Sequence, residues 1–166
     1  MQIPVGALAL VSAALVFAAP AEAQTVKILL SSVSTVQVLH DTAPKHKVNK
    51  GDSVFFKDLL LNMVAQFGKK KSQPVAYDVG TVTYTSSVSR RLTCVATFPG
   101  IGTITYGGVV VDHKNGTTSF PIISGTGGFK NAKGTVTFGK GGTTSPNTFI
   151  VTVPGNPIQI HSGGVA

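Results

Sequence analysis

Val79-Gly80-Thr81-Val82-Thr83-Tyr84-Thr85 is the stretch that decides the fold of this chain. Val79 and the three threonines occupy every second position, and Gly80, Val82 and Tyr84 occupy the positions between them. β-Branched and aromatic residues favour the pleated backbone, and a period of two gives the two faces of a strand different environments. The segment is therefore predicted to be a strand with one face turned inward.

Segments with the same two-residue alternation lie before and after this stretch, and residues typical of turns separate them. Asn115-Gly116 suits a tight hairpin, and Pro99-Gly100 and Pro154-Gly155 are similar breaks. One stretch, Asp58 to Phe67, also has the spacing of a short helix. Short strands without covering helices predict an all-β barrel or sandwich. Further strands are expected at Val26–Leu30, Val33–His40, Ser53–Lys57, Leu92–Phe98, Thr103–Gly108, Thr118–Ile123, Gly134–Phe138 and Thr148–Val153.

The two ends of the chain differ from this pattern. Residues 7–19 are apolar or small, too short a run for a bilayer span, and Ala21 and Ala23 fit a signal-peptidase site. Residues 1–23 are thus predicted to be a signal peptide, giving a secreted, extracellular or periplasmic protein without stable membrane insertion. An uncleaved anchor or a short packed helix is the alternative. Residues 24–155 would form one domain, and residues 156–166 a flexible tail.

Composition narrows the functional classes. The 166 residues hold a single cysteine, Cys94, in an apolar strand pattern, so it is expected to be buried and inert. The formal net charge is +8, but apart from Lys69-Lys70-Lys71 and Arg90-Arg91, both expected in turns, the positive charges are scattered. No interleaving of arginine with aromatic residues appears, so nucleic acid is not an expected partner.

A glycine-rich segment carries a family resemblance. Residues 123–134, ISGTGGFKNAKG, resemble the GGTGxFxxAxG signature of plant dirigent proteins and a similar signature of allene oxide cyclases. Its structural residues would be Gly125, Thr126, Gly127, Phe129 and Gly134. Residues 49–58, NKGDSVFFKD, resemble the dirigent N-x-G-D-x-V-x-F-x-D segment, and residues 39–41 and 72–75 resemble two further motifs. The resemblance runs in order from about residue 33 to residue 153.

The resemblance implies a single eight-stranded antiparallel barrel with a central apolar lumen, assembled as a homotrimer or homodimer. Eight strands leave room for one small ligand. Asp41 matches a pocket aspartate of dirigents, and Asp58 aligns with a pocket position of both families, so both are candidate catalytic acids. A carboxyl group buried in an apolar lumen has a raised pKa and can protonate or hydrogen-bond a reactive oxygen. The alternative makes both residues caps of turns or of a helix.

The sequence differs from both families at several pocket positions, and this limits which of their functional residues can be assigned to this chain. Leu39 stands where the cyclases have a glutamate, Val82 replaces their pocket cysteine, and residues 117–119 replace an arginine of dirigents. The residues expected to contact a hydrophobic ligand are Leu39, Val82, Tyr84 and Tyr106.

Metal and cofactor chemistry are not expected. The spacing of His40, His46, His113 and His161 fits no metal site, and no serine nucleophile motif occurs. Residues 115–117 form a glycosylation sequon, whose simpler interpretation is a hairpin tip.

Three functions remain open. The first is a barrel that binds a phenolic or lipid-derived molecule and orients a reactive intermediate without a cofactor. The second is a cofactor-free isomerase or cyclase acting on an epoxide or enone. The third is a noncatalytic secreted module that binds a cell-wall or surface polymer, with its lumen filled by side chains.

Overall fold

A computed structural model describes residues 22–42, 47–110, 116–140 and 144–155 of the chain. Every segment expected to be a strand lies in one, except that Thr85 follows the end of β3. The elements are β1 (Gln24–His40), β2 (Ser53–Asn62), β3 (Pro74–Tyr84), β4 (Arg90–Phe98), β5 (Gly102–Val109), β6 (Thr118–Gly125), the short 3₁₀ helix η1 (Gly127–Phe129), β7 (Lys133–Phe138) and β8 (Thr144–Val153).

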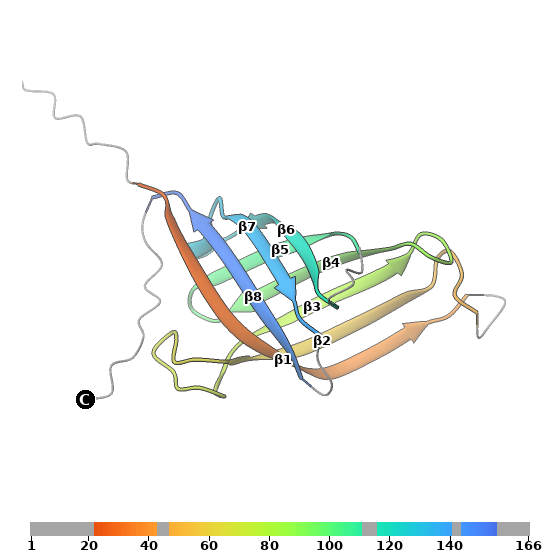
Figure 1. The fold of residues 1–166 in the computed structure, drawn as a ribbon, viewed down its shortest axis with the longest axis horizontal. Coiled ribbons are helices and arrows are strands. Elements are labelled where there is room, and N and C mark those ends of the chain that lie inside the picture. The colour runs from red at the N-terminus through yellow and green to blue at the C-terminus, as the bar shows by residue number, and fades with distance from the viewer. Residues whose placement is uncertain (1–21, 43–46, 111–115, 141–143, 156–166) are drawn as a thin grey trace, which may run out of the picture.

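The strands form one closed antiparallel barrel in chain order, from β1 to β8 (Figure 1). β1 closes it, since its residues pair with β2 on one side and with β8 on the other. The expected all-β, eight-stranded antiparallel barrel is confirmed, and the sandwich is excluded. Closure leaves no free edge where β1 and β8 pair, so the sheet can be stable without a disulfide.

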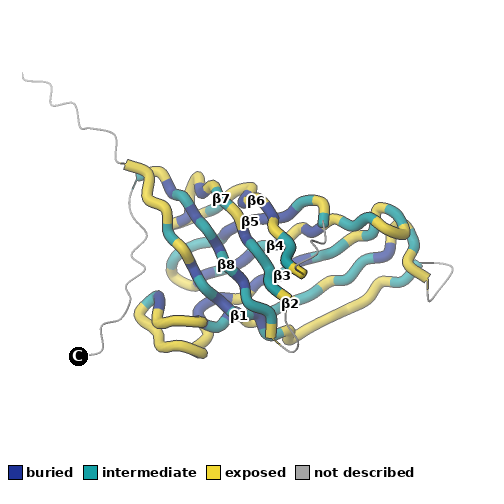
Figure 2. The backbone as a smooth tube through the Cα atoms, viewed as in Figure 1, coloured by how far each residue is buried: buried dark blue, intermediate teal, exposed yellow. Residues whose placement is uncertain are grey.

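β1 is longer than expected, because the two predicted strands at residues 26–30 and 33–40 are continuous. Its pairing with β8 ends at Val33↔Thr144, whereas its pairing with β2 continues to His40↔Ser53 across a bulge between Ser34 and Val36. Residues 34–40 are exposed along this extension (Figure 2). At this end β1 to β4 run on beyond β7 and β8 (Figure 1), so the barrel has one closed half and one open half.

The helix considered for residues 58–67 is wrong, because β2 continues to Asn62, which pairs with Leu30 of β1, while its pairing with β3 continues to Leu61↔Pro74 across a register shift. Buried side chains hold the turn that follows. The Asn62 amide donates to the carbonyl oxygens of Gln66 and Lys69 at 2.9 and 3.1 Å. The Gln66 amide donates to the Leu29 carbonyl at 2.9 Å and accepts from the Leu29 N–H at 3.1 Å. These bonds replace those a helix would have supplied.

Arg90 and Arg91 were expected in a turn, but they are the first residues of β4. They pair with Tyr84 and Thr83 of β3. Strand alternation therefore sends the two arginine side chains to opposite faces of the sheet.

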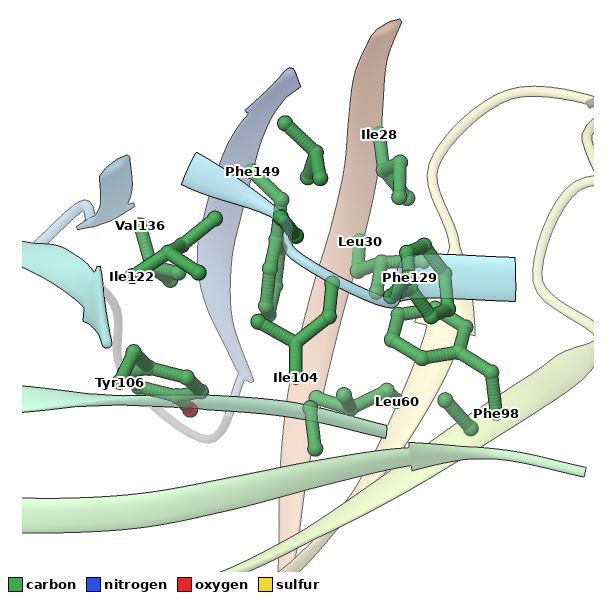
Figure 3. Packing of buried hydrophobic residues seen from close by; sticks show 14 of the residues in the cluster. Ile28, Leu30, Leu60, Phe98, Ile104, Tyr106, Ile122, Phe129, Val136 and Phe149 are labelled. Atoms are coloured by element: carbon green, nitrogen blue, oxygen red, sulfur yellow. The ribbon is translucent and has the colours of Figure 1, made fainter. Parts of the chain in front are cut away.

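Apolar side chains fill the closed half of the barrel (Figure 3). Phe98, the last residue of β4, has its ring centroid 5.0 Å from that of Phe129 and 6.2 Å from that of Phe149. Cys94 is 1% exposed, which confirms the expected burial. The fully buried apolar residues include Ile28, Leu30, Leu60, Ala96, Ile104, Val136 and Val151.

The glycine-rich signature closes this half from β6 into β7, where Gly125 ends β6, Gly134 lies in β7 and Phe129 is fully buried. Gly127 has φ +58°, and a Cβ atom there would lie 2.2 Å from the Ile101 carbonyl oxygen, so only glycine fits. The Thr126 hydroxyl accepts the Thr103 N–H at 3.1 Å. The signature is thus a structural crossing that seats Phe129 against Phe98.

Several sequence predictions lie outside the described residues: most of the signal peptide, the hairpin residue Asn115 with its sequon, His46, His113 and His161, and the tail. Within the described ranges, no helix has the length and apolar character needed to cross a bilayer.

The packing around Phe98 gives a stability prediction. Phe98→Ala should lower the free energy of unfolding by about 3–5 kcal/mol, because it removes the ring that contacts Phe129 and Phe149. Urea unfolding followed by far-UV circular dichroism measures the change. Val88→Ala is the control, since Val88 is 93% exposed, and should change stability by less than about 0.5 kcal/mol. A loss for Phe98→Ala no larger than for this control would contradict the described core.

Candidate functional site

The open half of the barrel holds a cavity of about 390 Å³ that opens to solvent. Its volume lies within the usual range for small-molecule sites. The walls are mainly apolar, with a few polar groups at the floor and at the mouth. The lining residues come from seven strands and the start of one loop: Ser32, Gln37, Val54, Phe56, Asp58, Val82, Tyr84, Arg90, Leu92, Val110, Thr118, Phe120, Phe138 and Ser145.

Two aspartates meet at the inner end of this cavity. Asp58 of β2 lines it, and Asp78 of β3 is the residue directly opposite Asp58 in the sheet. Cβ atoms of directly opposed residues lie about 5 Å apart, so the carboxyl groups can interact. Asp78 is fully buried, and it accepts a hydrogen bond of 2.8 Å from the Tyr106 hydroxyl.

Burial controls the charge of this pair. Burial raises the pKa of Asp78 to about 7; the Tyr106 hydrogen bond opposes the rise, and the charge of Asp58 adds to it. Burial also raises the pKa of Asp58, partly offset by a hydrogen bond from the Ser34 hydroxyl. Two close carboxyl groups lose their protons in coupled steps, so the pair retains a proton up to about pH 7. A carboxyl acid with a pKa near 7 is well matched to donating a proton at that pH.

The layer beneath the cavity contains further polar atoms. One oxygen each of Asp58 and Asp78, and both side-chain polar atoms of the fully buried Asn147, have no hydrogen-bond partner among the described residues. Burial raises the pKa of the Cys94 thiol and of the Tyr106 hydroxyl, so both stay protonated. Buried polar atoms without partners are uncommon in stable interiors and mark places where a ligand or water binds.

Gly80 makes room for the cavity wall. It lies between Asp78 and Val82 on the inward face of β3, and a Cβ atom there would lie 2.4 Å from Cζ of Phe56. Glycine at this position therefore leaves room for the Phe56 ring over β3, next to the inward position of Asp78.

The structure brings only part of the predicted site together. Asp58, Val82 and Tyr84 line the larger cavity. Asp41 and Leu39 line a smaller cavity of about 210 Å³, which shares Val54 and Tyr84 with the larger one. Asp41 and Asp58 therefore do not meet in one lumen, contrary to the sequence-based expectation. The alternative that Asp58 caps a turn or helix is wrong, because it lies within β2.

Tyr106 was predicted to contact ligand, but it is fully buried outside the cavity lining. Its ring packs against those of Phe138 and Phe149 at centroid distances of 5.8 and 5.7 Å. Tyr106 thus holds Asp78 from below the floor, which is a positioning role.

Sequence reasoning missed Asp78 and Arg90. Asp78 immediately precedes the segment 79–85 and alternates in step with Gly80, Val82 and Tyr84, so it is an acid on the same inward face. Arg90 shares its parity with the buried residues Leu92 and Cys94. Extending each alternation by one or two residues would have placed both inside the barrel.

The part of the chain that the structure describes holds no group of three histidine, cysteine or acidic residues suited to bind a metal ion. The two aspartates lie in a largely apolar environment and have raised pKa values. The site is therefore better suited to proton donation and hydrogen bonding than to metal ligation.

Comparisons with known proteins support the fold. No protein-family model and no curated protein sequence matches the chain. Among solved structures, a pyocyanin demethylase has 19% sequence identity and a TM-score of 0.64, covering 76% of this chain and 99% of that one. A pterocarpan synthase dirigent protein has 16% identity and a TM-score of 0.62, covering 83% and 90%. A Diels–Alderase from Streptomyces koyangensis has 16% identity and a TM-score of 0.61, covering 87% and 74%. The expected dirigent-like barrel is confirmed as a fold.

The buried aspartate gives a pH prediction. Folding raises the pKa of Asp78 from 3.8 to about 7, so the folded state holds this proton more tightly than the unfolded chain does. Its stabilising effect is complete below about pH 4 and is lost as the pH rises towards 7. Asp78→Asn keeps an acceptor for Tyr106 and removes this dependence. We therefore compare the free energy of unfolding of Asp78→Asn with that of the wild type. The variant should gain stability relative to the wild type between about pH 4 and pH 8, by at most about 4 kcal/mol.

Urea titrations at both pH values measure this difference. Asp52→Asn is the matched control, and its difference from wild type should be nearly the same at pH 4 and pH 8. Hydrogen bonds from Thr42 and the Asn49 N–H lower the pKa of Asp52, so that carboxylate stabilises the fold above about pH 4 and the effect is lost in acid. An Asp78→Asn difference that is the same at both pH values would contradict the described floor.

Proposed function

We propose that this barrel binds a small hydrophobic molecule in its larger cavity and orients a reactive intermediate over Asp58 without a cofactor. The observation that carries the proposal is the cavity itself: apolar walls lead down to an aspartate whose pKa burial raises. In such a site the apolar walls provide the affinity, and one hydrogen-bonding acid fixes the orientation.

The chemistry follows from the aspartate pair. Asp58 lines the cavity and would contact the ligand, whereas Asp78 lies beneath it and shares the retained proton. A protonated Asp58 can donate to a carbonyl, a quinone-methide oxygen or an epoxide oxygen. After the donation the pair holds one proton fewer and carries one more negative charge, and the carboxylate of Asp58 can then take a proton back from the bound intermediate or from water.

Names of structural neighbours are consistent with this reading. A demethylase, a dirigent protein and a Diels–Alderase are all named for chemistry on small molecules. A low-identity likeness carries no substrate, and the proposal for this chain depends on its own cavity. Export through a signal peptide at residues 1–23 and assembly into a homo-oligomer remain part of the same proposal.

The open cavity favours ligand binding over the noncatalytic alternative, which predicted an interior filled by side chains. The buried core contains Phe98 and Phe149, and a cavity of about 390 Å³ remains beside it. The isomerase or cyclase alternative uses the same floor and differs only in turnover. Asp58→Asn should retain most ligand affinity in a binding protein, but in an isomerase it should abolish product formation from an epoxide or enone substrate.

Blocking the cavity tests the proposal directly. Wild-type protein should bind the neutral fluorescent probe N-phenyl-1-naphthylamine, with a blue shift in its emission. Val82→Phe places a ring in the cavity and should weaken binding at least tenfold, about 1.4 kcal/mol. Thr83→Phe is the matched control, since Thr83 is the next residue along β3 and its side chain is exposed.

Thr83→Phe should bind the probe as the wild type does, and high salt should have little effect on either protein. Equal binding by Val82→Phe and wild type would place the probe outside the cavity and contradict the proposal. Binding lost at high salt would instead favour the polymer-binding alternative.

A further inference from the structure

Many of the basic residues gather at one end of the barrel, although they are scattered along the sequence. This closed end lies opposite the mouth of the larger cavity. It is formed by the start of β1, the end of β8 and the turns that join β2 to β3, β4 to β5 and β6 to β7 (Figure 1). The exposed lysines that lie there are Lys27, Lys69, Lys70, Lys71, Lys130 and Lys133.

Acidic residues are missing from the segments that form the closed end. No aspartate or glutamate occurs in residues 24–33, 59–77, 97–104, 123–135 or 148–155. Glu22 precedes β1 and belongs to the segment predicted to be removed as a signal peptide. The other acids that the structure describes lie at the cavity floor or nearer the mouth: Asp41, Asp52, Asp58 and Asp78. The positive charge of the closed end is therefore not balanced locally, and its field attracts an anionic partner.

The turn between β2 and β3 adds apolar side chains to this charge. Met63 and Val64 are 37% and 45% exposed, and residues 69–71 supply three lysines in the same turn. Figure 2 shows this turn projecting from the closed end with most of its residues exposed. The Met63 N–H donates to the Leu29 carbonyl at 3.0 Å, and the Gln66 amide donates to the same oxygen at 2.9 Å. A fixed turn thus presents apolar and cationic side chains together.

We infer that the closed end docks on an anionic lipid surface, with the lysines at the head groups and Met63 and Val64 in contact with the acyl chains. Proteins that lie on a membrane combine these two features, an apolar contact and a basic surface. Each lysine near an anionic bilayer strengthens binding about fivefold. The inference goes beyond the proposed function and does not depend on it, because a docked barrel keeps the mouth of its cavity towards solvent.

The apolar pair favours lipid over other anionic partners. An acidic polysaccharide or a nucleic acid would also be attracted by the lysines. Neither offers an apolar layer, so neither would gain from the exposed side chains of Met63 and Val64. A bilayer with anionic head groups matches both features of the turn.

Sedimentation with lipid vesicles tests the docking. The protein is used in one processed form, verified by intact mass, with vesicles of phosphatidylcholine alone or of phosphatidylcholine and phosphatidylglycerol in equal parts. Binding to the mixed vesicles should be at least about tenfold tighter than to the neutral ones and should weaken as the salt concentration rises.

A charge-neutralised variant locates the contact. It combines the three substitutions Lys69→Gln, Lys70→Gln and Lys71→Gln, and it should weaken binding to the mixed vesicles at least about tenfold. The matched control removes the same charge from exposed positions outside the closed end, by combining Lys50→Gln, Lys57→Gln and Lys140→Gln. This control should bind within about twofold of the wild type, because charges more than a Debye length from the surface are screened.

A second variant, Met63→Ser combined with Val64→Ser, separates lipid from a soluble polyanion. It should weaken vesicle binding about fivefold, since it removes the apolar contact. It should not change binding to polygalacturonate or to single-stranded DNA, which depends on charge alone.

Equal binding to neutral and mixed vesicles would overturn the inference, and so would equal losses in the lysine variant and its control. Loss of vesicle binding in the lysine variant with none in the Met63 and Val64 variant would indicate a polyanion and overturn docking on lipid. Binding of N-phenyl-1-naphthylamine without vesicles should be the same in every variant. A failure of the vesicle experiment therefore leaves the proposed function standing.

Discussion

Pairing of β1 with both of its neighbours is the constraint on which the rest of the structure depends. It closes the sheet between Gln24 and Val33, where β8 lies alongside, and it continues to His40 along β2 alone. One strand therefore belongs to two halves of different character. In the closed half the inward side chains meet across the barrel and exclude water. In the other half they line a hollow that opens to solvent.

The aspartate pair lies at the boundary between these halves, and this position gives it its properties. Asp78 is on the buried side with Tyr106 and Asn147, and Asp58 is on the cavity side. The apolar packing that stabilises the closed half also removes water from Asp78 and raises its pKa. In the proposed function, stability and proton donation are thus linked: the floor costs stability at neutral pH, and the same burial makes it hold a proton more tightly beside the cavity. Such a cost is common at functional sites.

Much of the fold could be predicted from sequence because strand alternation is local. The threonine- and valine-rich segments specified every strand, and the glycine-rich signature specified the crossing around Phe129. Register is not local, so the pairing of Asp58 with Asp78 could not be predicted. The same reason explains the error over Asp41, which follows β1 on the extension that β8 does not cover. The helix alternative for residues 58–67 failed because pairing with β3 outweighed a weak spacing signal.

The central claim is that the open half of the barrel is hollow and admits a small molecule as far as Asp58. A crystal structure of the protein soaked with an iodinated phenol tests this most directly, because the anomalous signal of iodine locates the ligand without interpretation of weak density. We expect an iodine peak within the barrel, between Val82, Leu92 and Phe120, with the phenol oxygen towards Asp58. A cavity filled by the protein's own side chains, with iodine bound only on the outer surface, would contradict it.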